Sequence, residues 1–231
     1  MELLGSLLSA KDCHIQKMSL AENAIGNKGA KALSRALLVN RTLTSLNLRN
    51  NNIGSKGAKF LAEALKTNQV LVSISFQNND IEEEGARALA EVLHCNRRLV
   101  SLNLRNNAIG VGGASRIAEA LKTNRTLTKL ILCSTRLGDR GAVALAEALA
   151  VNHTLRCLQS VLHHHSLTTL PHLHSQLYLT YTHNSTSPTL TTLPHLTHNS
   201  TSPHSQLYLT SLTTLPHLTH NSTSPHSDLY L

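Results

Sequence analysis

The sequence repeats itself every 28 residues over its first two thirds, and this period constrains the fold more than any other feature. Leucine or isoleucine recurs at this spacing at Ile15, Leu43, Leu71, Leu99, Leu127 and Leu155. A unit of this size is one supersecondary element, and it cannot bury its own apolar face. The repeat therefore predicts a solenoid in which successive units stack.

The first half of each unit predicts a short strand. In the second unit Leu46 and Leu48 alternate with polar residues, which suits a strand with one buried face. An asparagine follows in the first four units (Asn23, Asn51, Asn79 and Asn107), and Thr135 replaces it in the fifth. We expect its side chain to be buried at the bend and to bond backbone groups that the turning chain leaves unpaired.

The second half of each unit predicts a helix. Ala58, Leu61, Ala62 and Leu65 have the spacing of one helical face. Glycine precedes the helix in four units (Gly26, Gly54, Gly110 and Gly138), where a positive φ costs it little. An asparagine ends it in all five (Asn40, Asn68, Asn96, Asn124 and Asn152), which favours a left-handed closing residue. The predicted fold class is α/β, with a parallel sheet on the concave side and helices on the convex side of an arc.

The repeated phrase resembles a known family. Asn50-Asn51-x-Ile53-Gly54, followed by Gly57-Ala58 and Leu61-Ala62-Glu63-Ala64-Leu65-Lys66, looks like the ribonuclease-inhibitor type of leucine-rich repeat. Within that type it resembles the repeat domain of NOD-like receptors of the CARD-bearing regulatory subfamily, and residues 7–17 look like the start of that domain. The resemblance implies a horseshoe arc and a protein-interaction module that senses partners in an intracellular innate-immune receptor.

The chain departs from this family in ways that leave other roles open. No nucleotide-binding or death-fold domain precedes the repeats, and such receptors usually carry more than five of them. The sixth unit begins at Leu155 and then fails, with Ser160 where a leucine is due. A truncated product without independent function is therefore one alternative.

The composition changes near residue 160. All 21 Lys and Arg, and 12 of the 13 Asp and Glu, lie before it, whereas all six Pro lie after it. The later residues repeat phrases such as Thr-Thr-Leu-Pro-His-Leu with a dominant spacing of 22 and keep no helical or strand period. We predict an N-terminal segment at 1–14, leucine-rich repeats at 15–158 and a disordered low-complexity tail at 159–231. A translated tandem-repeat stretch would explain this tail.

The chemistry of the sequence argues against an enzyme. The repeat region has three histidines, His14, His94 and His153, and their positions do not converge on one site. No motif for a cofactor or a structural metal occurs, and the four cysteines have no C-x-x-C spacing. With no signal peptide and no apolar run long enough for a membrane, we expect free thiols and a cytoplasmic protein.

Basic charge raises nucleic acid as an alternative partner. Against it, the repeat region has only Phe60 and Phe76 as aromatics, both at expected core positions, so no platform for stacking bases is predicted. Its Lys and Arg also intermix with Glu on the helices. Glu82, Glu83 and Glu84 have two interpretations, an acidic docking patch or ordinary helix-start acids, and the second is simpler.

The candidate binding site is the concave face of the strands. Side chains that alternate with the buried leucines should point outward there. The partner-binding candidates are Ser45, Asn47, Arg49, Ser73, Ser75, Gln77, Ser101, Asn103, Arg105 and Lys129. Arg49, Gln77 and Arg105 form one column of donors that suits an acidic protein segment. The alternative is a plain hydrated surface.

Overall fold

A computed structural model describes Leu8 and residues 13–163, 175–184, 187–189, 191–193 and 205–210. Five units each contribute a strand and then a helix. They are β1 (Lys17–Ser19), α2 (Gly26–Val39), β2 (Ser45–Asn47), α3 (Gly54–Thr67), β3 (Ser73–Ser75), α4 (Glu83–Cys95), β4 (Ser101–Asn103), α5 (Gly110–Thr123), β5 (Lys129–Leu132) and α6 (Gly138–Val151). Then come β6 (Cys157–His163), β7 (Ser175–Asn184), β8 (Ser187–Thr189), β9 (Thr191–Leu193) and β10 (Ser205–Thr210).

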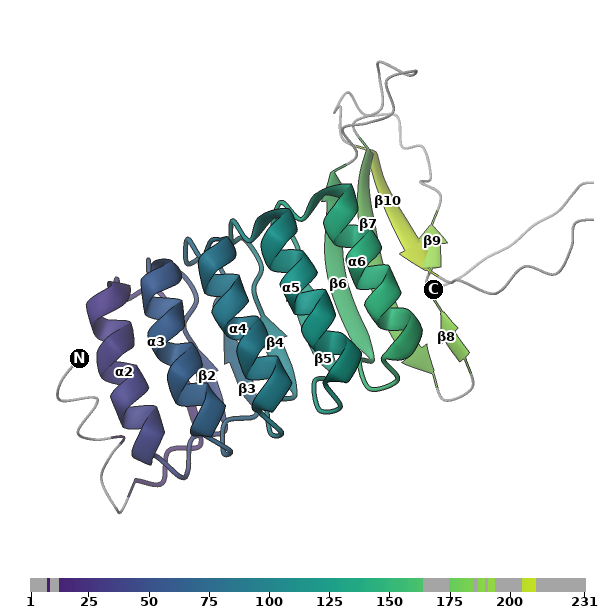
Figure 1. Ribbon diagram of the computed structural model, residues 1–231. Helices are drawn as coiled ribbons and strands as arrows, with labels where there is room; N and C mark the ends of the chain where they lie inside the picture. Colours follow the sequence, from purple (N-terminus) through teal and green to yellow (C-terminus); the bar gives the residue numbers. More distant parts are fainter. Residues whose placement is uncertain are drawn as a thin grey trace, which may run out of the picture.

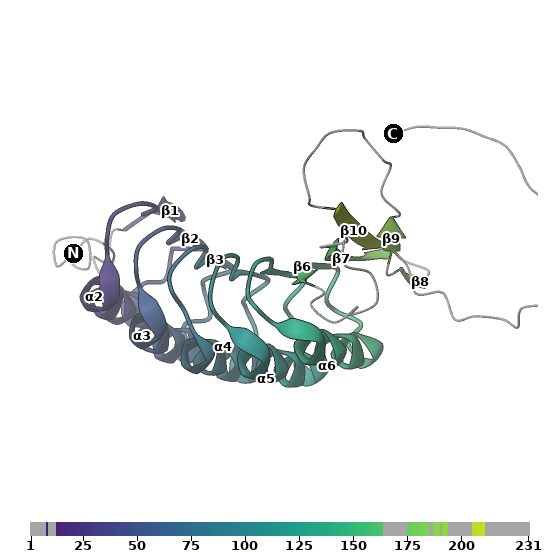
Figure 2. The same ribbon diagram turned by 90° about the horizontal axis from the view of Figure 1, so that it is seen from above.

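The strands and helices form two curved layers. Strands β1 to β6 are parallel neighbours in sequence order, and the helices lie side by side along one face of the sheet (Figure 1). Seen from above, the helices occupy the outer side of the arc and the strands the inner side (Figure 2). The predicted α/β solenoid is therefore confirmed.

The core lies between these layers and is built from the periodic apolar positions. Leu46, Leu48 and Leu61 are each at most 1% exposed, and so are their counterparts in the third and fourth units. Phe76 takes the place of Leu48 in the third unit and is fully buried. The prediction that Phe60 is a core residue is wrong. Its side chain is 38% exposed on α3, with the Lys31 ammonium 5.2 Å from the ring centre.

The asparagines after the strands form the expected buried ladder. The Asn79 Oδ1 accepts hydrogen bonds from the backbone N–H groups of Asn51 and Ile53, in the preceding unit, at 3.1 and 3.2 Å. Its Nδ2 donates to the carbonyls of Leu48 and Gln77 at 2.7 and 3.1 Å. Asn23 is the exception, because it begins the series and is exposed. Thr135 is buried but its side chain has no amide group, and its hydroxyl donates to the Leu132 carbonyl.

The asparagines that end the helices behave differently from the prediction. The backbone of Asn68 is extended, with φ −70° and ψ 113°, and the other four are extended as well, so none is a left-handed cap. The reason is a second ladder. Asn68 Nδ2 donates to the Leu37 carbonyl of the preceding helix at 2.7 Å, and its Oδ1 accepts from the N–H groups of Val70 and Leu71.

Glycine is required at two positions of the repeat, for two different structural reasons. Gly54 has the positive φ that was expected, +60°, at the start of α3. Gly57 lies inside the helix, where an added Cβ would meet the Ile53 side chain at 2.6 Å and the Ala30 side chain at 3.0 Å. This second glycine therefore allows neighbouring helices to approach closely.

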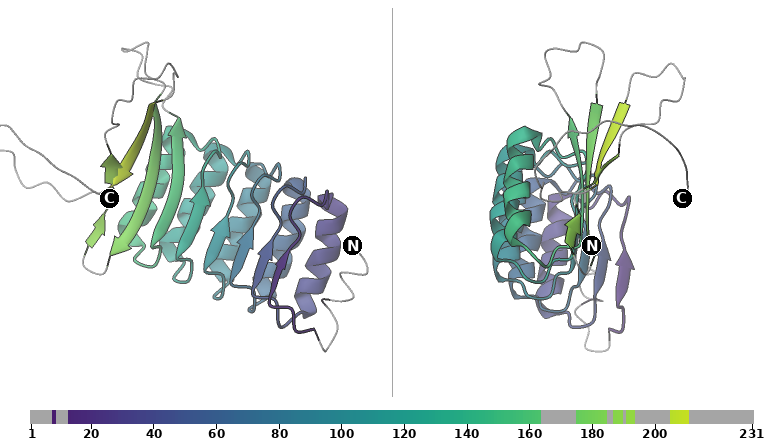
Figure 3. Two further views of the ribbon diagram at one scale, coloured as in Figure 1. Left: turned by 180° about the vertical axis from the view of Figure 1, so that it is seen from behind. Right: turned by 90° about the vertical axis from the view of Figure 1, so that its right-hand side faces the viewer.

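Beyond the fifth unit the sheet continues without a matching helix in the described residues. Strand β6 pairs with β5 in parallel and crosses the predicted boundary at residue 158. Strand β7 pairs antiparallel with β6, and β10, β9 and β8 extend the sheet from there (Figures 1 and 3). Parts of the tail thus form strands although its sequence lacks a strand period, because β6 offers an open edge for backbone pairing. Elsewhere the predicted tail lies outside the described residues, and its disorder stays a prediction.

Candidate functional site

The concave face carries the candidate residues in aligned rows. Strand pairing places Ser45, Ser73, Ser101 and Lys129 in one row, and Asn47, Ser75, Asn103 and Ile131 in the next. These side chains are partly or fully exposed, whereas the leucines between them are buried. In the second to fourth units the two rows present small polar groups, and the fifth unit adds Lys129 and Ile131.

The third column has more internal contacts than the sequence suggested. The Arg49 side chain is half exposed and lies 3.6 Å from a carboxylate oxygen of Glu22. The Gln77 Oε1 accepts a hydrogen bond from Asn103 Nδ2 at 3.5 Å. Arg105 is exposed and has no ion pair within the described residues. Two guanidinium groups therefore face solvent in this column, one of them beside a carboxylate.

Cys133 continues this column in the fifth unit. Burial raises the pKa of the Cys133 thiol, although the nearby positive charge of Arg105 acts in the opposite direction. The thiol therefore stays protonated near neutral pH and is a poor nucleophile. All four cysteines are free thiols, as expected from their spacing.

The convex helices carry a network of ion pairs between units. Lys59 on α3 contacts Glu84 on α4 at 2.7 Å, and Lys66 contacts Glu91 at 2.8 Å. Hydrogen bonds from these lysines lower the pKa of both carboxyl groups. Hydrogen bonds to Glu63 and Glu91 raise the pKa of Lys66 above its usual value. Glu83 and Glu84 lie in the first turn of α4, as the simpler interpretation predicted.

Most of the excess positive charge lies where helices return to strands. We define the helix-to-strand edge as residues 13–17, 40–46, 68–74, 96–102, 124–130 and 152–158. These segments contain no Asp or Glu. Their seven Lys and Arg are Lys17, Arg41, Arg97, Arg98, Arg125, Lys129 and Arg156. Basic and acidic residues do intermix on the helices, but this edge is purely basic.

Some of these arginines are held by the fold. Arg41 Nη1 donates to the carbonyls of Leu38 and Asn40, at the end of α2, and Arg125 makes the same contacts after α5. Their charge is favourable there because a helix carries partial negative charge at its C-terminus. A hollow of about 630 Å³ opens beside Arg41. It is lined by Cys13, His14, Gln16, Arg41, Thr42, Thr44, Gln69, Val70 and Arg98.

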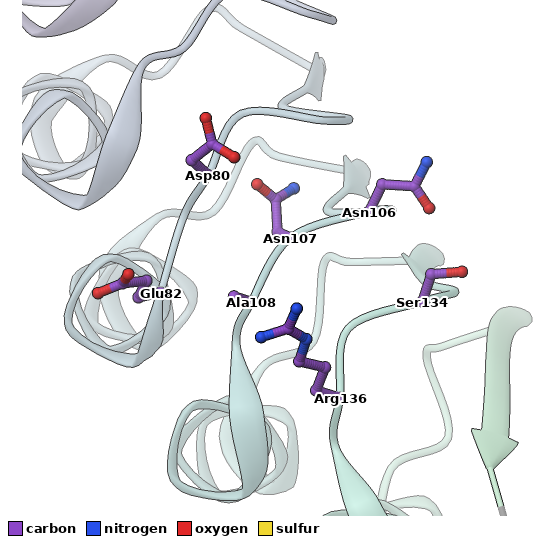
Figure 4. A pocket seen from close by; sticks show the side chains of 7 residues that line it. All are labelled: Asp80, Glu82, Asn106, Asn107, Ala108, Ser134 and Arg136. Atoms are coloured by element: carbon purple, nitrogen blue, oxygen red, sulfur yellow. The ribbon is translucent and has the colours of Figure 1, made fainter.

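The opposite edge, where strands lead into helices, holds a pocket of about 410 Å³ (Figure 4). We call it the edge pocket. It is lined by Asp80, Glu82, Asn106, Asn107, Ala108, Ser134 and Arg136. The sequence analysis missed it because no single unit shows it. Comparing one position across units (Asn52, Asp80, Ala108 and Arg136) would have revealed the change in charge.

A family model described as "Leucine Rich repeat" matches residues 11–34, 39–62, 67–90, 95–118 and 123–146, more than half of the chain. The chain belongs to the leucine-rich-repeat family.

The relatives of this leucine-rich-repeat chain include NOD-like receptors. Over 47 residues it is 79% identical to NLR family CARD domain-containing protein 3 of Homo sapiens and 74% identical to protein NLRC3 of Mus musculus. The match covers 20% of this chain and only 4% of each relative. Over this stretch the repeats are similar to those of NOD-like receptors, the family that the sequence resembled.

Solved structures agree with the leucine-rich-repeat fold. Actin-binding site 2 of leiomodin-1 has a TM-score of 0.55 at 22% identity, covering 64% of this chain and 86% of that one. The tropomodulin C-terminal domain of Caenorhabditis elegans has a TM-score of 0.54 at 16% identity, covering 65% and 92%. At these identities the likeness shows the fold alone.

Within the described residues, no three or more His, Cys, Asp or Glu side chains lie together in a way that could hold a metal ion. His94 contacts Thr123 at 3.1 Å on the convex side, far along the chain from His14 and His153. None of the helices in the described part is long and apolar enough to cross a membrane.

Proposed function

We propose that this leucine-rich-repeat chain is a protein-interaction module that receives an acidic protein segment on its concave face. The observation that carries the proposal is the register of the strands, which stacks Arg49, Gln77 and Arg105 on adjacent units beside rows of Ser and Asn. Small side chains let a partner backbone approach closely, and the guanidinium groups can donate paired hydrogen bonds to carboxylates.

The likeness to NOD-like receptors gives this module a biological setting. Repeats of this family contribute to sensing partners and to holding the receptor inactive, so the proposed location is the cytoplasm and the proposed role is binding without catalysis. The matched stretch is a small part of those receptors. The role in immunity is therefore part of the proposal.

The Arg49–Glu22 contact adds a requirement. An acidic partner that binds Arg49 must compete with the Glu22 carboxylate, 3.6 Å away. Glu22→Gln should therefore strengthen binding of an acidic partner, since it removes the competing charge without changing the side-chain size. Exposed ion pairs contribute little, so we expect a gain of roughly twofold to fivefold in affinity.

The main test uses a pair of charge reversals. A partner is first captured from cell extract treated with nuclease, and its capture by variants is then measured. Arg49→Glu with Arg105→Glu should abolish capture and leave the fold intact, because both side chains are exposed. Arg35→Glu with Arg116→Glu is the control, since it makes the same change in net charge on the convex helices.

The outcomes separate the surfaces. Capture at wild-type strength by the concave double variant would exclude this column and make the convex helices the next surface to test. Loss of capture in both double variants would indicate a dependence on overall charge, and would also contradict the proposal.

A second candidate function is nucleic-acid binding along the helix-to-strand edge. The specific observation in its favour is the absence of any Asp or Glu from that edge. Phosphate contacts depend on such basic surfaces, while the edge offers no aromatic side chain for stacking bases. Two results would favour this function. Nuclease treatment would remove all captured material, and the double variant Arg97→Glu with Arg98→Glu would bind a labelled oligonucleotide more weakly.

A further inference from the structure

The edge pocket exists because one unit lacks the side chain that its neighbours carry. Asn52, Asp80 and Arg136 occupy one repeat position, and the fourth unit has Ala108 there. Two residues later, an added Cβ on Gly110 would meet no atom within 4 Å. The fourth unit therefore leaves an open space of about 410 Å³ between the third and fifth units.

The walls of this pocket carry opposite charges. Asp80 and Glu82 stand on the side of the third unit, and Arg136 on the side of the fifth. In Figure 4 the Arg136 guanidinium extends toward Ala108, into the gap between the units. Asn107 lies between the two walls. Its amide is already used, because it donates to three carbonyls and accepts two backbone N–H groups.

These three charges have no partner within the described part of the chain. The side chains of Asp80, Glu82 and Arg136 take part in none of its ion pairs. The contrast with Glu84 is informative, because that neighbouring carboxylate contacts both Lys59 and Arg87 at 2.7 Å. Ion pairs join α3 to α4, whereas the charges that line this pocket have none among the described residues.

We propose that the edge pocket binds a segment of a partner protein that presents a basic side chain to Asp80 and Glu82 and a carboxylate to Arg136. This inference rests on the proposed role in protein interaction, and it names a second contact outside the concave column. The two walls are two units apart, or about 10 Å at the usual spacing of strands. In a segment with the polyproline II conformation, which has three residues per turn, residues i and i+3 lie on the same face and are separated by a similar distance, about 9 Å.

Other ligands fit this lining less well. Sites for small organic molecules are mostly hydrophobic, whereas the pocket has one alanine and six polar or charged residues. A divalent cation needs a shell of oxygen ligands, and the Arg136 charge would oppose it. A segment with both signs of charge satisfies both walls.

The probe is an acetylated and amidated octapeptide, Gly-Ser-Lys-Gly-Ser-Glu-Ser-Gly, with a neutral version carrying Gln in place of Lys and Glu. Binding is followed by the backbone amide shifts of Ala108 and Ser134 in NMR titrations. The charged peptide should shift these amides with a dissociation constant on the order of 1 mM, and the neutral one should not.

Three variants copy the residue of the second unit into the pocket. Asp80→Asn and Arg136→Asn should each weaken binding of the charged peptide by roughly threefold to tenfold. Both native residues have positive φ, as Asn52 does, so asparagine suits the backbone. Ala108→Asn should abolish binding by filling the space with no change in charge. Asn52→Asp, away from the pocket, should leave binding unchanged.

The result that would overturn the proposal is an equal response to the neutral peptide, or full binding by Ala108→Asn. Shifts spread over the helix-to-strand edge instead of Ala108 and Ser134 would also overturn it. Arg49→Glu with Arg105→Glu should still bind the peptide. A result that contradicts binding at the concave column can therefore be distinguished from one that contradicts binding at the edge pocket.

Discussion

Buried asparagines connect each unit to its neighbour. Asn79 has no exposed surface, and its four hydrogen bonds join the backbones of the second and third units. At the end of α3, the Asn68 side chain joins that helix to α2 by donating to the Leu37 carbonyl. A leucine core alone would leave these backbone groups without partners in a place that water cannot reach.

Asn79→Ala should therefore destabilise the repeat region strongly. The N–H groups of Asn51 and Ile53 would remain buried without an acceptor, and each such group costs about 1–3 kcal/mol. We expect the free energy of unfolding to fall by about 2–4 kcal/mol, measured by urea denaturation followed by circular dichroism.

The matched control is the same substitution in the first unit. Asn23 is exposed and its amide donates only to the nearby Ala21 carbonyl, so Asn23→Ala should change stability by less than about 0.5 kcal/mol. Asn79→Thr, which introduces the residue found at Thr135, should lower the free energy of unfolding by an amount between those of Asn23→Ala and Asn79→Ala. Equal effects at positions 23 and 79 would show that the ladder contributes no stability.

The sequence predicted some residue roles better than others. Leu46 and Leu48 were placed correctly because burial alternates along a strand, whatever surrounds it. Phe60 was misplaced because its hydrophobicity says nothing of which helix face it occupies. Asn68 was given a left-handed backbone, a local property, whereas its partner is a carbonyl 31 residues away. Contacts between units escape analysis of one unit at a time.

Helices α2 to α5 are each followed by another helix, whereas no helix follows α6 among the described residues. Ala118 on α5 is 1% exposed, but Ala146, at the same place on α6, is exposed. Val143 on α6 is 59% exposed. The equivalent residue on α3 is Lys59, which contacts Glu84 on the next helix. The last helix is thus held from one side only.

Residues 127–150 should therefore exchange their amide hydrogens faster than residues 43–110. Units in a solenoid are stabilised by their neighbours, and in the part of the chain that the structure describes no helix follows this unit. Hydrogen exchange read by mass spectrometry measures the difference. Uniform protection along both ranges would contradict the prediction, and would indicate that a partner or a second copy covers α6.

At this scale the sequence could predict the pairs within one helix but not those between helices. Glu63 and Lys66 are three residues apart, a spacing that shows in the sequence. Lys59 and Glu84 are 25 residues apart and meet only because the units stack. The edge pocket could not be predicted for the same reason, since its walls come from the third and fifth units.

The whole molecule combines a regular arc with strands contributed by a different kind of sequence. Strand β6 ends the parallel series, and β7 reverses the direction of the sheet. Ser160 on β6 is 1% exposed, and its hydroxyl has no hydrogen-bond partner in the described residues. The repeat pattern therefore ends at a residue whose side chain is poorly suited to the core.

Truncation after His163 should leave the repeat region folded. The five helices that the structure describes lie between Gly26 and Val151, and β6 is retained. The helical signal per molecule in far-ultraviolet circular dichroism should be nearly unchanged. Truncation after Asn124 is the comparison, since it removes α6 and should lower that signal. Loss of most of the helical signal in the chain truncated after His163 would show that the tail supports the arc.

The constant register between strands has a genetic consequence. Lys17, Ser45, Ser73, Ser101 and Lys129 stand opposite one another at steps of 28 residues. A copying error that deleted or duplicated 84 nucleotides within this stretch would therefore rejoin a strand, bend and helix in phase, wherever the break fell. Such an error changes the length of the arc and leaves its cross-section intact. Gene lineages with this architecture can therefore gain or lose whole units without breaking the pairing between strands.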